Sequence, residues 1–575
     1  MPDLNISRKN IYSIFSERGV NFLIPDYQRP YSWEQEHCET LWEDLKNFAF
    51  PADKDFDDDN DEYFLGTIVT FKNDYGQNEV IDGQQRLITL HLLLRAFYAA
   101  FGEMQNRTYA RISECIWHMD KNDNPDLARL KINSEVATDD DIAELKKIIT
   151  SGESTEKNKS LYAENYRYFQ RKIDEFKLAT PDRFSIFSKR ILDNCILLPI
   201  ETNSQGTALR IFTTLNDRGM PLSDSDIFKA QFYKLYKAQG RQAKENFVRR
   251  WKDLEALCNK NFHPRTGTPV DDLFMRYMYY LLAKDGVKSD TFKGLRPYYE
   301  QDNYKILRSE KTFEDLETLA KFWDDVARRD EQRFSERVLR RLYVLSFSPH
   351  SLWAYIVSLY FMGNKDSQDR LDDEKFYRFL QKITAMILMH SIANPGTHNV
   401  RRPFFVEFQN ILRGVDLRFK YYLQDGKFFR EQLRNTKFSQ TKKITRAMLT
   451  WWTFHDEKQE LPPLGTSLEI EHIYARNRVN FEPLENPENL ELLGNKILLE
   501  KRINIRAADY RFADKKKYYR GYTPAKGKFQ RGTDNLELQQ LAESKSDFTE
   551  NDILARNEKI LSAFMEYLTQ NNLLR

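Results

Sequence analysis

Two kinds of apolar spacing follow one another along the chain, and their order limits the folds that the chain can adopt. Residues 64–71 are rich in β-branched and aromatic side chains, as strands are, and residues 79–82 have the same character. Residues 88–101 then follow helical spacing, and residues 194–200 form a later apolar run of strand length. The first part of the chain is therefore predicted to be an α+β domain.

The middle of the chain has mainly helical spacing. Thr268 can accept the first free N–H groups of a helix, and Pro269 suits the first helical position. The residues that follow place apolar side chains on one helical face: Val270, Leu273, Phe274, Tyr277, Met278, Leu281 and Leu282. Similar spacing recurs up to about residue 450, without the fixed period of a solenoid. We expect helical core packing in this region.

An uncharged stretch, residues 342–364, is long enough to span a bilayer. However, Pro349, His350, four serines and Gly363 interrupt it, and charged helical sequence follows. We therefore predict a buried pair of helices there and no membrane span.

The chain has 575 residues, which suits several domains, and we predict three: residues 1–235, 236–440 and 441–575. Its 88 basic and 86 acidic side chains leave a net charge of only +2. Such a protein is not a basic arm that coats nucleic acid by bulk charge. Any basic surface must therefore be local.

The cysteine pattern argues against a disulfide framework or a zinc knuckle. Cys38, Cys115, Cys195 and Cys258 are far apart and include no Cys-x-x-Cys pair, which fits a reducing compartment. No basic-then-apolar signal segment opens the sequence, so a cytoplasmic location is expected. The acidic run at residues 53–62 lacks the central glycine of a calcium loop and is interpreted as a solvated linker.

The last fifth of the chain holds residues suited to phosphodiester hydrolysis. An apolar-alternating segment ends in Glu471 and His472, and a Gly-Asn-x-Ile-Leu-Leu segment contains Asn495, with Asn504 nine positions beyond it. A strand, a returning strand and a helix would bring these side chains together. Attack by water on a phosphodiester needs a base for the nucleophile and a cation for the leaving oxygen.

Each of these four residues has a candidate role. His472 can be the base, and Asn495 can hydrogen-bond the histidine and fix its tautomer. The Glu471 carboxylate and the Asn504 carboxamide are hard oxygen donors suited to Mg²⁺ or Mn²⁺. A lone Glu-His pair on a strand is usually only a polar edge. The joint occurrence of the three segments favours the catalytic interpretation.

A basic segment follows these residues. Residues 501–531 contain eleven basic and two acidic residues, and six tyrosines and phenylalanines are interleaved with them. A charge run is usually a solvated face, but this one adjoins the candidate hydrolytic residues, so a phosphate-binding surface is predicted. The candidate DNA contacts are Lys515, Lys516, Lys517 and Arg520.

The N-terminal part contains three polar motifs, at residues 24–33, 82–86 and 212–223. In the second, Asp-Gly-Gln-Gln-Arg, the glycine and the start of a helix allow backbone N–H groups to approach a phosphate. Arg86 can clamp phosphate oxygens, and Asp82 can hold a metal or position water. An ordinary strand-to-helix turn with a salt-bridged arginine remains the alternative, since no Walker A or Gly-x-Gly-x-x-Gly sequence is present.

Taken together, these segments resemble the GmrSD-type modification-dependent (type IV) restriction enzymes. The motifs Ile-Pro-x-Tyr-Gln-Arg, Phe-Leu-Gly-Thr-Ile, Asp-Gly-Gln-Gln-Arg and Phe-x-x-Leu-Asn-x-x-Gly, spread over residues 8–235, are similar to the GmrS half. The resemblance implies a ParB- and sulfiredoxin-like α+β fold that binds and hydrolyses a nucleoside triphosphate. The nucleotide-binding residues implied are Gln28, Arg29, Gly83, Gln84, Gln85, Asn216 and Arg218, with Asp82 and Arg86 as catalytic residues.

Residues 440–525 are similar to the GmrD half, a His-Me finger (HNH) nuclease with a ββα-metal fold. The resemblance implies His472 as the general base, and Glu471 and Asn504 as metal ligands. Many HNH domains have Asp where Glu471 stands, although Glu is common in this branch of the family.

The resemblance as a whole implies an NTP-regulated, metal-dependent endonuclease that restricts modified phage DNA. A helical middle would couple the two activities or form a homodimer. The expected partners are double-stranded DNA and a nucleoside triphosphate, with no membrane. Two alternatives stay open: an HNH nuclease acting on RNA or unmodified DNA, and a ParB-like DNA-binding regulator with an inactive nuclease fold.

Overall fold

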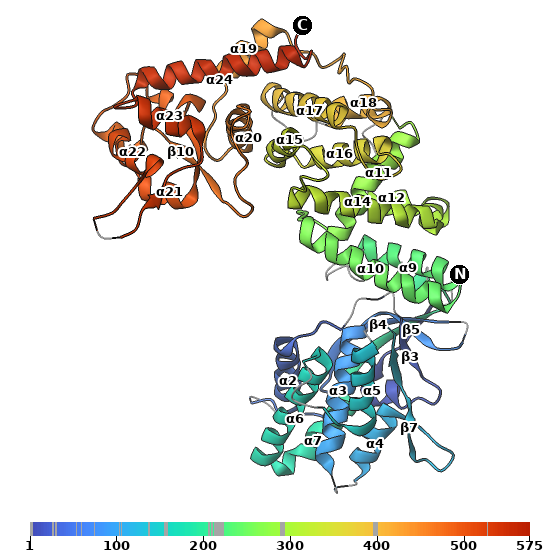
Figure 1. Ribbon diagram of the computed structural model, residues 1–575. Coiled ribbons are helices and arrows are strands. Elements are labelled where there is room, and N and C mark those ends of the chain that lie inside the picture. The colour runs from blue at the N-terminus through green and yellow to red at the C-terminus, as the bar shows by residue number, and fades with distance from the viewer. Residues whose placement is uncertain are drawn as a thin grey trace. The chain divides into compact units, whose positions relative to one another are not determined.

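The computed structural model describes residues 4–25, 28, 31–52, 55–58, 60–73, 75–102, 104, 106–135, 139–154, 159–204, 207–208, 211, 223–287, 294–394, 401–525 and 527–575. The chain forms two compact units, residues 1–248 and 249–575 (Figure 1). The first unit combines a sheet with helices, and the second is mainly helical. The chain is therefore α+β, as predicted, whereas the division into three domains stays a prediction.

The described strands of the first unit form a mixed sheet in the order β1-β9-β4-β5-β3-β8, with β2 beside β9. β4 is parallel to β9 and antiparallel to β5, and β3 is parallel to both β5 and β8. The strands predicted at residues 64–71, 79–82 and 194–200 are confirmed as β4, β5 and β9. The strand bounds are β1 Leu4–Ile6, β2 Lys9–Asn10, β3 Phe22–Ile24, β4 Tyr63–Lys72, β5 Asn78–Asp82, β8 Ile132–Ser134 and β9 Cys195–Thr202, with a separate hairpin of β6 Trp117–Met119 and β7 Pro125–Leu130.

Helix α3 lies at the centre of the first unit and confirms the helix predicted at residues 88–101. Thirteen of its residues are buried, so it is apolar nearly all round, as expected for a helix enclosed by other elements. It packs against α4, α5 and α6, and one core cluster joins it to the sheet. The helix bounds are α1 Ile11–Phe15, α2 Gln35–Ala49, α3 Gln84–Phe101, α4 Arg107–Ile116, α5 Asp139–Ser151, α6 Leu161–Ala179, α7 Pro181–Asn194, α9 Asp224–Lys237 and α10 Arg241–Asn261.

Helix α11 of the second unit begins where the sequence predicts it, at Pro269 after the cap residue Thr268. The Thr268 hydroxyl accepts from the backbone N–H of Asp271 at 3.1 Å, and the Asp271 carboxylate accepts from the N–H of Thr268 at 2.7 Å, so both halves of the capping box are satisfied. The bounds of the helical region are α11 Pro269–Lys284, α12 Leu295–Tyr299, α13 Gln301–Tyr304, η2 Lys305–Arg308, α14 Glu310–Arg328, α15 Glu336–Ser346, α16 Leu352–Asn364, α17 Asp373–Ala393, α18 Arg401–Leu412, α19 Gly426–Arg434 and α20 Lys443–Thr453.

The uncharged stretch at residues 342–364 is confirmed as parts of two helices, α15 and α16, separated by the turn that contains Pro349. Among the described residues, no helix is both long enough and apolar enough to cross a membrane.

The C-terminal part of the second unit contains the predicted strand, returning strand and helix. β10 (Leu468–His472) pairs antiparallel with β11 (Lys496–Glu500), and α21 (Lys501–Ala507) follows directly. A compact apolar core lies behind them and includes Ile473, Ile497 and Leu499. The remaining bounds are η3 Arg476–Asn480, η4 Pro487–Glu491, η5 Leu493–Asn495, α22 Phe512–Arg520, β12 Gly521–Tyr522, β13 Gln530–Arg531, α23 Leu536–Ser544 and α24 Glu550–Gln570.

Candidate active site

The β10–β11 pair brings three of the predicted C-terminal residues together. Glu471 and His472 are the last two residues of β10, and Asn495 immediately precedes β11. The backbone N–H of Ile473 donates to the Asn495 carbonyl at 2.9 Å, which continues the ladder by one step. Asn504 lies on α21, which packs against both strands.

His472 is buried and lies near several cations. Only 6 % of the residue is exposed, and its Nε2 has no hydrogen-bond partner among the described residues. Burial lowers the pKa of His472 well below its usual range, and the cations of Lys496 and Arg476 lower it further. The imidazole is therefore neutral near pH 7, which is the form that accepts a proton.

Glu491, which sequence reasoning missed, is the carboxylate next to this histidine. Its Oε1 lies 3.7 Å from His472 Nε2 and 3.1 Å from an Nη of Arg476, and its Oε2 lies 2.8 Å from Nζ of the buried Lys496. Burial raises the pKa of Glu491, but Lys496 outweighs that effect, so the pKa is lowered and the side chain is an anion. Lys496 lies opposite His472 in the strand register. A lysine paired with the histidine across the two strands is the one sequence feature that could have indicated an ion network here.

Asn495 does not have the partner that we predicted. Its side chain is completely buried, and its Oδ1 accepts from the N–H of Tyr474 at 2.7 Å. Its Nδ2 donates to the carbonyls of Tyr474 and Leu490 at 3.1 and 3.0 Å. The amide is therefore used by the backbone that follows His472, not by the imidazole ring. Asn495 therefore positions His472 through hydrogen bonds to the backbone of the nearby residue Tyr474. The side chain beside the imidazole ring is Glu491.

A buried arginine from α24 supports the loop that holds Asn495. Arg556 donates to the carbonyls of Leu493, Gly494 and Lys496 at 3.1, 3.0 and 2.8 Å and pairs with Glu537 at 2.7 Å. A Cβ on Gly494 would overlap the carbonyl of Ile553 in α24, so only glycine permits this approach of the two backbones. This explains the glycine of the Gly-Asn motif.

Glu471 forms a buried ion pair. Its Oε1 accepts from Lys515 Nζ at 2.6 Å and from the Tyr519 hydroxyl at 3.0 Å, and Lys515 also donates to the His472 carbonyl at 3.0 Å. Burial raises the pKa of Glu471, while Lys515 acts in the opposite direction. Lys515 was predicted to contact DNA, but its side chain is only 1 % exposed. That expectation is corrected, because the ammonium neutralises the buried Glu471 carboxylate.

Asn504 lies beside a second carboxylate of β10. Its Nδ2 donates to Glu469 Oε2 at 2.8 Å, which leaves its carbonyl oxygen as the possible ligand. The oxygens of Glu469, Glu471 and Asn504 suit a hard divalent cation in their chemistry. In the described part of the chain, no three His, Cys, Asp or Glu side chains form a ready-made metal centre.

The other predicted DNA contacts lie on α22 with Lys515. Lys517 and Arg520 are exposed, and Lys516 is half-buried and donates to the carbonyl of Lys545 at 2.6 Å. The helix therefore exposes the charged groups of Lys517 and Arg520 to solvent and buries that of Lys515.

In the first unit, two of the three polar motifs meet at the start of α3. Gln28 is buried, and its Nε2 donates to the carbonyls of Val80 and Ile81 in β5, at 3.4 and 3.2 Å. Gln85 Oε1 accepts from the N–H of Ser32 at 2.8 Å. Gly83 precedes α3 with φ +90°, so a glycine suits this turn, and Asp82 and Gln84 flank it. Arg29, Asn216 and Arg218 lie outside the described residues.

Arg86 lies against the backbone of β4. An Nη of its guanidinium donates to the Thr67 carbonyl at 2.8 Å, and a Cβ on Gly66, which has φ +118°, would lie 2.8 Å from Arg86 Cζ. Burial lowers the pKa of Arg86, and Asp82 acts in the opposite direction. Arg86 thus has a structural role in the strand-to-helix turn, whatever else it contacts.

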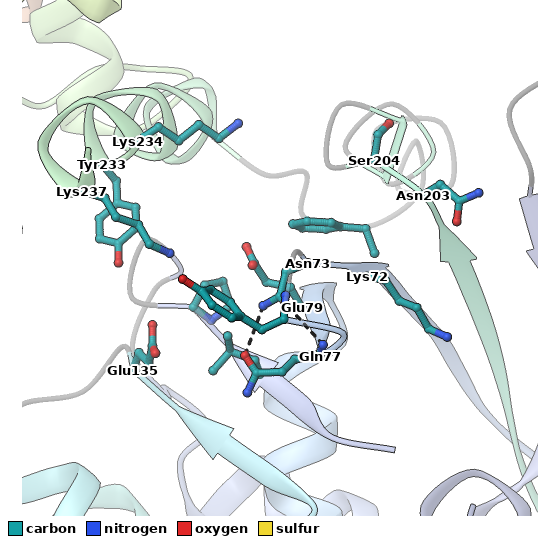
Figure 2. A pocket seen from close by; sticks show the side chains of 14 residues that line it. Lys72, Asn73, Gln77, Glu79, Glu135, Asn203, Ser204, Tyr233, Lys234 and Lys237 are labelled. Atoms are coloured by element: carbon teal, nitrogen blue, oxygen red, sulfur yellow. Dashed lines mark hydrogen bonds between the residues drawn. The ribbon is translucent and has the colours of Figure 1, made fainter. Parts of the chain in front are cut away.

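A pocket of about 370 Å³ lies elsewhere on the first unit, between the sheet and α9 (Figure 2). Lys72, Glu79 and Glu135 contribute from the sheet and the segments beside it, and Lys234 and Lys237 from α9. None of the described residues predicted to bind nucleotide lines this pocket. Sequence reasoning missed these residues, because they belong to no local motif.

Two protein-family models match the chain. The family described as "GmrSD restriction endonuclease, N-terminal domain" matches residues 11–233. The family described as "GmrSD restriction endonucleases, C-terminal domain" matches residues 424–563, which include the His472 cluster and Arg556. No curated protein matches the chain.

Proposed function

This chain belongs to the GmrSD family of restriction endonucleases, and on that premise we propose that it is an NTP-regulated, metal-dependent DNA endonuclease that restricts modified phage DNA. A restriction endonuclease acts on DNA, and the C-terminal part of the second unit is the proposed HNH-type nuclease. The observation that carries this proposal is His472, a buried neutral histidine at the end of β10 with an anionic carboxylate beside its ring.

His472 is proposed as the general base that takes a proton from the attacking water, since its lowered pKa keeps the accepting form populated. Glu491 would favour the imidazolium that forms, because its carboxylate oxygen lies 3.7 Å from Nε2. Asn495 and Arg556 position the histidine indirectly. Asn495 accepts from the backbone N–H of Tyr474, and Arg556 donates to the carbonyl of Lys496 on the paired strand.

Asn504, Glu471 and Glu469 are the residues that would hold a cation in this centre. Mg²⁺ or Mn²⁺, when bound, supplies charge neutralisation for the phosphate. Lys515 adds a fixed positive charge next to Glu471, so the carboxylate is held in one orientation before any cation binds. Lys517 and Arg520 on α22 are proposed to contact the DNA backbone, with Lys516 beside them.

For the first unit, we propose that Asp82, Gly83, Gln84, Gln85 and Arg86 bind and hydrolyse a nucleoside triphosphate. The support is the adjacency of this turn to the motif that contains Gln28, together with a helix N-terminus preceded by a glycine. Arg29, Asn216 and Arg218 complete the proposed site on the grounds of the family motifs.

The test is cleavage of matched plasmids that are unmodified, methylated, glucosylated or phosphorothioated, with each NTP in turn. We expect cleavage of at least one modified plasmid, with Mg²⁺ or Mn²⁺ and an NTP, and none in excess chelator. Cleavage that persists in chelator contradicts the metal dependence. Equal cleavage of all plasmids contradicts the proposed specificity, and cleavage of RNA alone contradicts the proposed substrate.

A further inference from the structure

The second unit contains a larger pocket, of about 990 Å³, far along the sequence from β10 and β11. Helix α17 supplies Lys375, Arg378 and Lys382, and the segment between α18 and α19 supplies Asp416, Arg418 and Lys420. The end of α24 closes another side with polar residues. No sequence motif pointed to this pocket, because its basic residues come from segments about 40 positions apart.

The charge of the pocket is strongly one-sided. It has five basic side chains and one acidic one, in a chain whose net charge is only +2. In the described part of the chain, Lys375, Arg418 and Lys420 have no ion-pair partner. Arg378 pairs with Glu374 one helical turn away at 2.8 Å, and Lys382 donates to the carbonyl of Asn571. The pocket therefore holds uncompensated positive charge.

Buried side chains of three helices meet at the pocket. Tyr360 of α16 stacks on Phe379 of α17 with ring centroids 4.0 Å apart, and both side chains are buried. The Tyr567 hydroxyl of α24 donates to the side chain of Gln381 at 2.7 Å. These contacts join α16, α17 and α24 at the pocket, while Arg418 and Lys420 come from the segment between α18 and α19.

We propose that this pocket binds the phosphate backbone of double-stranded DNA and is an anchoring surface in addition to α22. Lys375, Arg378, Arg418 and Lys420 are all exposed, as backbone-contacting side chains are, whereas a site for a small nucleotide encloses its charged groups. Phosphate contacts of this kind raise affinity through counterion release and read no sequence. The inference rests on the proposed action of the protein on DNA.

The test compares three full-length proteins, all carrying His472→Ala so that the DNA stays intact. The pocket variant adds Lys375→Glu, Arg418→Glu and Lys420→Glu. The matched control adds Lys305→Glu, Arg308→Glu and Lys321→Glu, which reverse three exposed charges of the same unit outside the pocket. Binding of a fluorescein-labelled DNA duplex is measured by anisotropy over a range of NaCl concentrations. A glutamine version of the pocket variant replaces the glutamate version if the latter does not fold.

We expect the pocket variant to bind more weakly than the control, with a salt slope smaller by about 0.9 for each DNA phosphate that the protein no longer neutralises. An unchanged slope, or an equal decrease in the control, overturns the inference. Loss of ATP binding with unchanged DNA binding also overturns it and makes the pocket a nucleotide site. If the parent protein binds no DNA at any salt concentration, the proposed function fails as well, so the two failures are distinguishable.

Discussion

The ammonium of Lys515 lies 2.6 Å from a carboxylate oxygen of Glu471, and both side chains are buried. Removal of one partner of a buried ion pair is strongly destabilising, because the other partner is left buried without a counter-charge. Here the pair joins α22 to the end of β10 and adds a bond to the His472 carbonyl. The basic segment therefore has a structural attachment to the candidate active site.

We predict that Lys515→Met lowers the free energy of unfolding of the second unit by about 3–5 kcal/mol, because it leaves the buried Glu471 carboxyl without its cation. Lys517→Met, on the exposed face of the same helix, is the control and should change stability by about 0.5 kcal/mol or less. Denaturant titration measures both. The double variant Lys515→Met with Glu471→Gln should recover most of the loss, and a single variant as stable as the wild type contradicts the account.

Glu491 is predicted to assist the histidine. Glu491→Gln keeps the shape of the side chain but removes the negative charge 3.7 Å from His472 Nε2. An anion this close favours the imidazolium that forms as the water is deprotonated, and losing about 1.4–2.8 kcal/mol of that stabilisation slows cleavage roughly ten- to hundredfold. Glu488→Gln, at an exposed position of the same short helix, is the matched control. A Glu491→Gln enzyme with the wild-type rate would show that this carboxylate serves only the ion pairs with Lys496 and Arg476.

Substitution of Arg86 distinguishes a nucleotide-binding site from an ordinary strand-to-helix turn. Arg86→Ala removes the bond to the Thr67 carbonyl, so it should lower the free energy of unfolding by about 1.5–3 kcal/mol and also abolish NTP hydrolysis. Arg86→Lys keeps a positive charge at this position and is the matched comparison. Melting temperature and NTPase rate are measured on the same preparation. A folded Arg86→Ala protein with normal turnover would leave this turn without a catalytic role.

The pH dependence of the first unit should depend on His91. Burial lowers the pKa of His91 to about 4, from an ordinary value of 6.5, and its Nε2 has no partner among the described residues. Below pH 6.5 the unfolded chain binds a proton that the folded unit does not, so stability should fall by roughly 3 kcal/mol as the pH drops towards 4.

His91→Leu should therefore flatten the acid-side loss of stability, whereas His37→Leu, at an exposed histidine, should leave it unchanged. Hydrogen exchange of α3 at several pH values reports on this unit within the full chain. The same pH dependence in wild type and His91→Leu would contradict the assignment.

The elements of the fold were predictable where the signal is local. β4 and β5 are recognisable from β-branched residues, and α11 from the Thr268–Asp271 cap and the apolar stripe that follows. The order of strand, strand and helix around His472 also follows from the apolar alternation and the spacing of Asn495 and Asn504.

The partners of the site residues were not predictable, because they come from distant segments. Lys515 is 44 positions from Glu471, and Arg556 is more than 60 positions from the Gly494 loop that it supports. Sequence reasoning assigned Asn495 to the histidine ring because nothing local shows that the Tyr474 backbone uses its amide. It assigned Lys515 to DNA because a basic run does not reveal which of its members faces the core.

The central claim is that His472 is the base of a nuclease, and it is tested most directly by the cleavage rate of His472→Ala on a substrate that the wild type cuts. Losing a general base typically costs about 10²–10⁴-fold, so cleavage should fall by that factor while DNA affinity, NTP hydrolysis and melting temperature stay near wild-type values. His263→Ala, at an exposed histidine of the same unit, should cleave normally. Wild-type cleavage by His472→Ala would contradict the account.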